Sequence, residues 1–578
     1  MVASISGVMR LFLRWVFGLV SLATWVHGVD VYVVAGQSNG WRLSHLSAGA
    51  QSVGPVVHYF GMDCVSEPES STMRTLSSLS TGTMGYGLAD ALRRKSGGEI
   101  VFVQYCRCGA PVTSEAPNSW FPGEDPENGK VFEAGLMVRF ERYIKSVREQ
   151  VEQSGRKWEV KGVIWHQGES DVSSDKTRFE KDLKNVFARF RRLLGADVPI
   201  VAGHIRDLGE RQRAVNEVLD RLASQDPLMA TVGLDGVTYE GDDKNGNPNV
   251  HINREGCHTL GRSLAKALDR KRLASAVVRA GGRVEVEGGE IVSIDLYNGN
   301  NPLKGKGGKN EAVTDDWLAG LAGCTSLRKL HLTNCAITNA GLVHLKGLTG
   351  IEDLNLTLTP VSDEGLGHLS GLSNLRNLGL ASTQCTGSGF ANLRGLKRLE
   401  NVNFHFTPLD DGGLAEVVAT GVSGRLWFAH TKFSDEGAAC LSKLKDLRIC
   451  GLGSKALGSS GAAVAHLKGI KALEDLSLLD NQADIAGIQH AAEMRQLRRL
   501  DVSYAPMADD ECLRKLASLP VLGELSLGGS SKVTGAGLLA LAGTKSLKKL
   551  TLGKMKNVGA DDLARLRQQR PDLEVIEK

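Results

Sequence analysis

The chain has 578 residues, too many for a single hydrophobic core, so at least two domains are expected. Hydrophobic residues make up 42% and charged residues 23%, as in ordinary globular proteins, and the net charge of +4 gives no reason to expect a nucleic-acid partner. The sequence has no phosphate-binding loop, no dinucleotide-binding fingerprint and no His-Glu-x-x-His motif, so nucleotide and zinc-protease chemistry are not indicated.

The first 28 residues have the pattern of a secretory signal peptide. Arg10 and Arg14 precede an apolar run over residues 15–26, and Gly28 stands at a suitable cleavage position. The run is shorter than the ~20 residues that a membrane-spanning helix needs. We therefore predict an exported protein (periplasmic, extracellular or on the cell surface) without a membrane span in the mature chain.

Residues 29–272 alternate between short apolar runs and longer amphipathic segments. The first predict strands and the second predict helices. The predicted strands are Val31–Val34, Ile100–Tyr105, Val160–Trp165 and Pro199–Gly203, and the predicted helices are Val131–Ser154, Phe179–Leu194 and Leu260–Arg272. This alternation indicates an α/β domain in which helices cover both faces of a parallel sheet.

Residues 273–290 are expected to form a linker. Two glycine pairs, Gly281-Gly282 and Gly288-Gly289, bracket a short run of alternating polar and apolar residues, Arg283–Val286. Such a run between glycine pairs predicts a small hairpin or edge strand.

Residues 291–578 contain a repeat of about 24 residues. Apolar residues recur along each unit, followed by Thr and, after a turn, by Gly. Successive units place at equivalent positions Leu330, Leu354, Leu378, Val402 and Leu426; Thr359, Thr383, Thr407 and Thr431; and Gly341, Gly365, Gly389, Gly413 and Gly437. The unit L-x-x-L-x-L-x-x-T resembles the leucine-rich repeat family, with Thr in place of the usual Asn or Cys.

This resemblance implies a curved α/β solenoid in which the Leu positions form the core. Any binding function would lie on exposed strand positions such as His331, Asn355, Asn403 and His405. The ligand of the repeats is expected to be a protein or a polysaccharide.

The ten cysteines do not form a metal-binding pattern, because no second pair follows Cys106-x-Cys108 at a suitable spacing. We predict no metal and no cofactor. A disulfide from Cys64 to Cys106 or Cys108 stays open. The cysteines of the repeats are expected to be buried small hydrophobic residues, mostly; they are Cys335, Cys385, Cys440, Cys450 and Cys512.

A serine follows the first predicted strand at the sequence Gly36-Gln37-Ser38-Asn39. A residue at the carboxyl end of a strand in an open α/β sheet lies where such folds bind ligands. The plain alternative is that Ser38 only caps a helix.

The motif at Ser38 resembles the nucleophile motif of the sialate O-acetylesterase-like branch of the SGNH hydrolases, which act on acetylated sialic acid or xylan. Two further blocks agree in order. The first is Trp165–Asp171, similar to the family's W-x-Q-G-E-x-D. The second begins at His251 and includes Gly256 and Leu260-Gly261-Arg262. The resemblance covers residues 29–272 and implies a flavodoxin-like, three-layer fold.

The resemblance implies a catalytic role for Ser38 and His251. A Ser hydroxyl must lose its proton as it attacks an ester carbonyl, and an imidazole accepts that proton near neutral pH. The negatively charged oxygen of the intermediate needs hydrogen-bond donors. The resemblance assigns this role to the Ser38 N–H, the Gln167 side chain and the N–H of a glycine. Gly82 is favoured for the glycine, with Gly85 and Gly109 as alternatives.

The acid of the triad departs from the family pattern, since Pro248 occupies the position three residues before His251 where that branch commonly has Asp. Glu169 is the favoured orienting carboxylate, and Asp242 or Asp243 is the alternative. A Ser–His dyad without an acid is a third possibility. A purely structural role for Glu169 and Asp171, tying down backbone N–H groups of a loop, is compatible with orienting the histidine.

Other polar and aromatic residues have plainer interpretations. His166 and His204 are expected to be structural residues at strand ends. Arg206 either lines the pocket or forms a surface salt bridge. Trp41 and Trp120 either stack on a sugar ring or belong to the core.

The sequence thus predicts an exported carbohydrate O-acetylesterase, a serine carboxylic-ester hydrolase, joined to a leucine-rich solenoid. Three alternatives are a catalytically impaired carbohydrate-binding or protein-interaction protein, a lipid or thioester hydrolase on the same fold, and a recognition protein in which the solenoid carries the main function.

Overall fold

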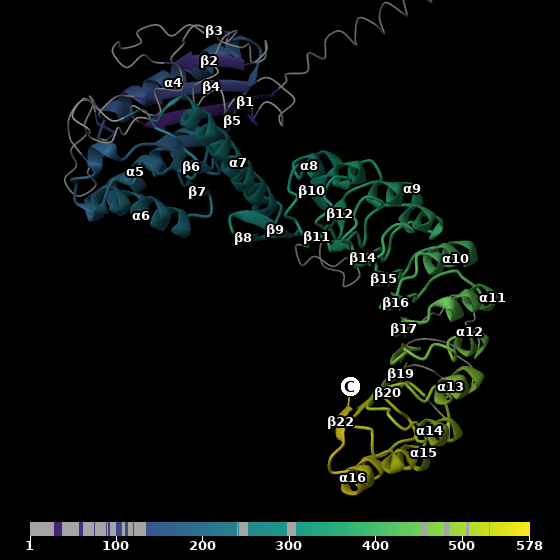
Figure 1. Cartoon of the computed structure of the whole chain (residues 1–578). Coiled ribbons are helices and arrows are strands. Elements are labelled where there is room, and N and C mark those ends of the chain that lie inside the picture. Colours follow the sequence, from purple (N-terminus) through teal and green to yellow (C-terminus); the bar gives the residue numbers. More distant parts are fainter. Residues whose placement is uncertain are drawn as a thin grey trace, which may run out of the picture. The chain divides into compact units, whose positions relative to one another are not determined.

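A computed structural model describes two compact units, Met1–Ser275 and Ala276–Lys578 (Figure 1). The described residues are 28–36, 57–61, 74–75, 88, 91–92, 100–106, 110–113, 119–120, 135–239, 241, 252–297, 308–452, 461–478, 485–503, 508–530 and 532–577. The segment predicted as a signal peptide lies outside them, apart from Gly28. Within them, no helix combines the length and the apolar character needed to cross a bilayer.

The first unit is built on a seven-stranded sheet with the order β3-β2-β4-β1-β5-β6-β7. Its strands are β1 (Gly28–Gly36), β2 (Val57–Gly61), β3 (Arg74–Thr75), β4 (Ile100–Cys106), β5 (Lys157–His166), β6 (Ile200–Gly203) and β7 (Met229–Val232). All neighbours pair in parallel except β2 and β3. The strand that carries the Ser38 motif is therefore central.

The residues of β1 alternate between two hydrophobic cores, one on each face of the sheet. Val31, Val33 and Ala35 pack with one set of helices, and Tyr32 and Val34 pack with another. The first face is covered by α4 (Leu136–Gln153), α5 (Lys176–Leu194) and α6 (Glu210–Gln225), and the second by α7 (Arg254–Arg279) and the helical residues around Leu88 and Leu92. The predicted three-layer α/β fold is confirmed.

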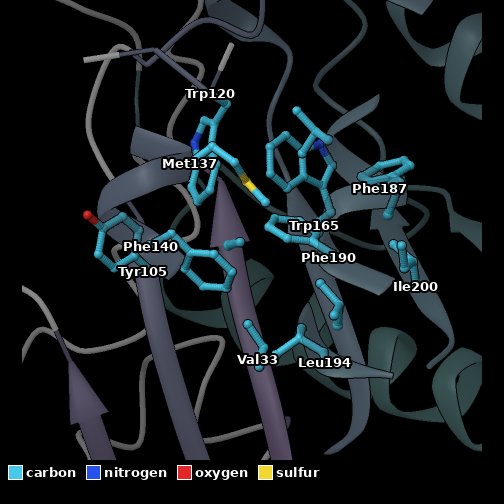
Figure 2. Packing of buried hydrophobic residues seen from close by; sticks show 14 of the residues in the cluster. Val33, Tyr105, Trp120, Met137, Phe140, Trp165, Phe187, Phe190, Leu194 and Ile200 are labelled. Atoms are coloured by element: carbon cyan, nitrogen blue, oxygen red, sulfur yellow. The ribbon is translucent and has the colours of Figure 1, made fainter. Parts of the chain in front are cut away.

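A cluster of aromatic rings fills the first core (Figure 2). Trp120 lies edge-on to Trp165 with ring centroids 5.2 Å apart, and to Phe140 and Phe190 at 5.9 Å. Trp120 and Trp165 are both completely buried. The core interpretation of Trp120 is therefore correct, and its ring does not face a sugar; Trp41 lies outside the described residues.

Several features of the first unit were not predicted in their observed form. Helix α6 and the strands β2, β3 and β7 had no counterpart in the sequence-based prediction. Helix α7 runs from Arg254 to Arg279, so that residues expected in the linker continue a helix instead. After it, β8 (Arg283–Glu287) and β9 (Glu290–Asp295) form the expected hairpin.

The second unit contains a thirteen-stranded sheet in which each repeat contributes one strand, and β8 is its only antiparallel member in the described residues. After β8 and β9, its strands are β11 (Lys329–His331), β13 (Asp353–Asn355), β14 (Asn377–Gly379), β15 (Asn401–Asn403), β16 (Arg425–Trp427), β17 (Ile449–Gly451), β18 (Asp475–Ser477), β19 (Arg499–Ser503), β20 (Glu524–Gly528), β21 (Lys549–Leu552) and β22 (Glu574–Glu577). A separate pair is formed by β10 (Asn310–Thr314) and β12 (Cys335–Ala336).

Short helices cover the other side of this sheet. They are α8 (Asp315–Ala319), α9 (Asp363–Leu366), α10 (Asp411–Ala419), α11 (Asp435–Ala438), α12 (Gly461–Ala465), α13 (Ile485–Ala492), α14 (Asp510–Leu516), α15 (Gly535–Ala540) and α16 (Ala560–Gln569), with 3-10 turns in several repeats. Figure 1 shows the strands on the inner, concave side of the arc and the helices outside. The predicted solenoid is confirmed.

The repeat positions behave as their spacing predicts. Leu354, Leu378 and Val402 stand in register on neighbouring strands and are at most 1% exposed. The Thr that replaces the usual Asn has a hydrogen-bonding function. The hydroxyl of Thr383, for example, donates to the carbonyl of Leu380 at 2.6 Å. The equivalent bonds of Thr359, Thr407 and Thr431 measure 2.6–2.8 Å.

An acidic residue at the start of each of several helices joins one repeat to the next. Asp363 accepts hydrogen bonds from the N–H and hydroxyl of Thr386, both at 2.8 Å, and from the N–H of Gly389 at 2.9 Å. A Cβ atom at Gly389 would lie 2.6 Å from the carbonyl oxygen of Asp363, so this close approach requires glycine. The recurring Gly of the repeat is explained by such contacts.

The cysteines of the repeats are free thiols, and all are buried except Cys440 and Cys324, which are half-buried. Burial raises the pKa of the Cys385 thiol to about 12. Their interpretation as small core residues is confirmed. Cys64 and Cys108 lie outside the described residues, so the open disulfide question is not tested.

Candidate active site

The register of the central sheet brings three chain segments to one edge. Gly36, at the end of β1, pairs with Cys106 at the end of β4 and with His166 at the end of β5. Because the strands are parallel, the residues that follow each of them leave the sheet at the same edge. Ser38 comes two residues after Gly36, and Gln167 comes directly after His166.

Several predicted site residues lie outside the described residues. These are Ser38, His251, Gly82, Asp242 and Asp243, together with the alternatives Gly85 and Gly109. Gln167 and Glu169 are described, and so are the segments that lead to the other two catalytic candidates, through Gly36 and from Ile252.

Gln167 is completely buried, and two acceptors fix the orientation of its side-chain amide. Its Nε2 donates to the carbonyl of Ala110 at 3.2 Å and to the carboxylate of Asp171. A flipped amide would place an oxygen against both acceptors, so the observed orientation is the stable one. Oε1 has no hydrogen-bond partner within the described part of the chain.

Asp171 ties the loop after β5 to the loop after β4. Its carboxylate accepts the N–H of Val112 at 2.9 Å and the N–H and hydroxyl of Thr113 at 3.2 and 2.8 Å. The side chain is completely buried. The structural interpretation of this residue is confirmed, and the same carboxylate also holds the amide of Gln167.

The glycine between Gln167 and Glu169 is required by backbone geometry and by packing. Gly168 has a φ of 154°, and a Cβ atom there would lie 2.6 Å from a methyl group of Val215 on α6. The following residues, Glu169–Asp171, form a single 3-10 turn. The close packing of α6 therefore sets the direction in which Glu169 leaves the sheet.

Tyr239 links Glu169 to the segment that carries His251. Burial is the main cause that raises the pKa of the Tyr239 hydroxyl; the negative charge of Glu169 raises it further, and the positive charge of Arg206 opposes both. The guanidinium of Arg206 lies 4.1 Å from the centre of the Tyr239 ring. Tyr239 also forms an antiparallel bridge with Ile252, the residue after His251.

Asn253 fixes this segment to Tyr239. Its Nδ2 donates to the carbonyl of Tyr239 at 2.8 Å, and its Oδ1 accepts the N–H of Gly256 at 2.9 Å. Sequence reasoning missed Tyr239 and Asn253. Neither belongs to the motifs that carry the resemblance, and only their contacts across the fold reveal a role.

The two histidines expected to be structural have structural contacts. His166 is buried, and its Nδ1 lies 3.3 Å from the carbonyl oxygen of Gly203. His204 pairs with Asp220 at 2.9 Å. Among the described residues, no three His, Cys, Asp or Glu side chains are grouped so as to hold a metal ion.

The fold and these loops define the class of the protein: a doubly wound α/β domain with polar loops at the carboxyl edge of its central strands, followed by a leucine-rich solenoid. Residues 28–270 match the family model of the carbohydrate esterases, sialic acid-specific acetylesterase, and residues 323–345 match a leucine-rich repeat model. The chain therefore carries a domain of this esterase family followed by leucine-rich repeats.

Several solved structures are similar to the chain, each over less than half of its length. A carbohydrate acetylesterase from Xanthomonas citri is 15% identical, over 46% of this chain and 63% of that one, with a TM-score of 0.32. An internalin from Listeria monocytogenes is 17% identical, over 44% and 75%, with a TM-score of 0.33. A protein from Arabidopsis thaliana is 17% identical, over 42% and 98%, with a TM-score of 0.31. No curated protein was found to match the chain.

Proposed function

We propose that the first unit is a carbohydrate O-acetylesterase that uses Ser38 as its nucleophile and His251 as its base. The observation that carries the proposal is the register of β1 with β5, in which Gly36 pairs with His166. This register leads the Ser38 motif and the Gln167–Asp171 loop to one edge of the sheet. The esterase family match over residues 28–270 supports the same reaction class.

In the proposed reaction, the hydroxyl of Ser38 attacks the acetyl carbonyl while His251 accepts its proton. The tetrahedral intermediate collapses, His251 returns the proton to the sugar oxygen, and the alcohol leaves with acetyl bound to Ser38. A water molecule then attacks the acyl-enzyme with the same assistance and releases acetate. No cofactor takes part in these steps.

The N–H groups of Ser38 and Gly82 are the proposed oxyanion donors, with Gly85 or Gly109 as alternatives to Gly82. Gln167 is the proposed third donor. Both hydrogens of its Nε2 are already directed at Ala110 and Asp171. The contact with the Ala110 carbonyl, at 3.2 Å, is the longer and uncharged one, so it is the one that an oxyanion would replace.

Glu169 is the proposed orienting carboxylate for His251. Its charge acts on Tyr239, and Tyr239 bridges to Ile252, next to His251. Asp242 and Asp243 are the alternative, on the loop that precedes the histidine. In either case the carboxylate fixes the tautomer of the imidazole and stabilises its protonated form.

Two further parts of the proposal concern the whole chain. The basic residues and the apolar run before Gly28 support export by a signal peptide. The concave face of the solenoid supports binding of a protein or polysaccharide partner. Mass spectrometry of the N-terminus of the mature protein tests the first part.

Release of acetate from nitrophenyl acetate and from an acetylated sugar tests the catalytic proposal. Ser38→Ala should reduce kcat by at least about 10³-fold, because a triad without its nucleophile keeps only binding and oxyanion stabilisation. His251→Ala should have a similar effect. Ser146→Ala, on the exposed face of α4, is the matched control and should leave the rate unchanged.

The same assay separates the candidate acids. Glu169→Gln should lower kcat more than the double variant Asp242→Asn, Asp243→Asn. Unchanged acetate release in Ser38→Ala would exclude the enzyme assignment. Sugar binding with no acetate release by the unmodified protein would instead support the non-catalytic alternative that Pro248 suggests.

A further inference from the structure

A row of charged residues stands one position before each strand of the large sheet from β11 to β19. Its members alternate in sign, apart from one interruption. The row reads Arg328, Glu352, Arg376, Glu400, Gly424, Arg448, Glu474 and Arg498. Within it, Arg376 pairs with Glu400 at 2.8 Å and Arg498 with Glu474 at 3.9 Å.

The interruption at Gly424 leaves Arg448 without a partner. Gly424 has no side chain to offer, and Glu474, on the other side of Arg448, pairs with Arg498. A Cβ atom at Gly424 would lie 2.8 Å from the backbone carbonyl oxygen of Glu400, a contact that favours glycine at this position. Within the described residues, the exposed guanidinium of Arg448 forms no ion pair.

Arg425, the first residue of β16, is the second unpaired arginine. Its neighbours in the register are the uncharged Asn401 on β15 and Ile449 on β17. The nearest acid in its row is Asp475, two strands away at ~10 Å between backbones, and Arg499 pairs with it at 3.0 Å. Two arginines on adjacent repeats thus share one site without an ion-pair partner among the described residues, although the charge of Arg425 acts on Asp475.

These arginines line a hollow of about 1120 Å³ along the beginnings of the strands from β15 to β20. Small residues, including Ser423, Gly424 and Ala472, make room for it. Asp446, Glu524 and the paired acids also line it, so the positive charge is local to Arg425 and Arg448 and does not extend over the whole hollow. The volume exceeds the ~300–1,000 Å³ of sites for drug-sized ligands, which favours an oligomeric ligand.

An aromatic surface adjoins the two arginines. Trp427 lies two residues after Arg425 and therefore on the same face of β16, ~7 Å along the strand. A Cβ atom at Gly451 would be 2.2 Å from the indole ring, so the half-buried ring extends across β17 where no side chain obstructs it. His405 packs against it edge-on, with ring centroids 5.9 Å apart.

We propose that this surface, formed by Arg425, Arg448 and Trp427, binds a carboxylate-bearing sugar of an acidic oligosaccharide. The guanidinium groups match the charge and the planar, two-oxygen geometry of a carboxylate. The negative face of the indole attracts the C–H bonds on the apolar face of a sugar ring. The carboxylates of an acidic peptide form ion pairs with the arginines equally well, but a peptide makes no specific contact with the flat indole surface.

The test is calorimetric titration of the full-length protein with four probes. They are an oligogalacturonate, its methyl ester, an oligomer of sialic acid and a polyglutamate peptide. At least one of the two acidic sugars should bind, and the tighter of them identifies whether a uronic or a sialic acid is preferred. Methyl esterification should weaken binding of the oligogalacturonate about tenfold or more, because it removes the charge that the arginines recognise.

Variants separate the contributions of charge and ring. Arg425→Gln combined with Arg448→Gln should weaken binding of the acidic sugar at least tenfold, and these exposed changes should leave the fold intact. Trp427→Ala should weaken binding as well, with circular dichroism as the check on folding. Arg514→Gln, an exposed arginine on α14, is the matched control and should bind as the unmodified protein does.

Four results would overturn the proposal. The first two are that neither acidic sugar binds, or that the methyl ester binds as tightly as the free oligogalacturonate. The third is that the double arginine variant binds the acidic sugar as tightly as the unmodified protein does. The fourth is that polyglutamate binds as tightly as the acidic sugars and that Trp427→Ala does not change its affinity. The last result would identify an acidic-peptide site. None of these outcomes depends on whether Ser38 is catalytic.

Discussion

The two units of this protein build their cores in different ways. In the first, the aromatic cluster joins residues that are far apart in the chain, such as Tyr105, Trp120 and Phe190. In the second, each strand pairs with the strands of the adjacent repeats, and the same contacts recur about every 24 residues. The first unit can therefore bring distant residues to one site, whereas the second presents an extended surface whose stability is nearly a sum of local terms.

The largest expected effect tests whether the solenoid behaves as an independent array. Leu378→Ala should destabilise the solenoid by about 2–5 kcal/mol, because it leaves a cavity at a position that is 1% exposed. Scanning calorimetry should show a lower melting temperature for one transition, with acetate release unchanged at 25 °C.

Val343→Ala is the control for this experiment, since Val343 belongs to the same solenoid but is 45% exposed. A parallel loss of esterase activity in Leu378→Ala would contradict the independence of the two units.

An intermediate effect tests the dependence of the first unit on long-range contacts. Asp171→Ala should destabilise that unit, because it removes the carboxylate that accepts the N–H groups of Val112 and Thr113. The expected loss in the free energy of unfolding is at least about 1.5–3 kcal/mol, the contribution of one hydrogen bond to a charged group. It should also lower kcat more than it raises KM, since Gln167 loses the partner that orients its amide.

Ser170→Ala, at the exposed residue beside Asp171, serves as the control and should change neither quantity. If Asp171→Ala unfolded the unit without a separable effect on kcat in the folded fraction, the positioning role would be refuted and only the structural one would remain.

The smallest effect concerns His405 on the concave face. Burial, and secondarily the positive charge of His430, lowers the pKa of His405 below its usual value of about 6.5. The unfolded chain therefore binds a proton at a higher pH than the folded solenoid does. The contribution to stability is complete above about pH 6.5 and is lost as the pH falls from there through the folded-state pKa.

A two-dimensional NMR titration of the imidazole signals measures this pKa directly. His405→Phe should reduce the loss of solenoid stability between pH 7 and pH 5. A folded-state pKa of 6.5 or above would contradict the expectation.

The repeats could be predicted in detail because a solenoid is encoded locally. The periodic Leu, Thr and Gly positions specify both the strands and the contacts between them. In the first unit, β1, β4, β5, β6 and most helices followed from apolar runs, whereas β2 and β3 were not predicted. Helix α6 was missed although Val215, Val218 and Leu222 lie on one face at helical spacing. Its short partner β7 carries no comparable signal.

The arrangement of the candidate site depended on contacts that no local pattern contains. The bond between Asp171 and the N–H of Val112 spans 59 residues, and the amide of Gln167 is oriented by Ala110, 57 residues away. The motif predicted that Gln167 and Asp171 belong together. Only the pairing of β4, β1 and β5 shows which loop they hold.

The ends of the thirteen-stranded sheet have a consequence for how copies of the protein meet. Within the described part of the chain, its outermost strands, β8 and β22, each pair with a neighbour on one side only, and such edges promote aggregation. β8 carries Arg283, Glu285 and Glu287, all exposed, and β22 begins and ends with the exposed Glu574 and Glu577. These charges disfavour the edge-to-edge stacking of one solenoid onto another.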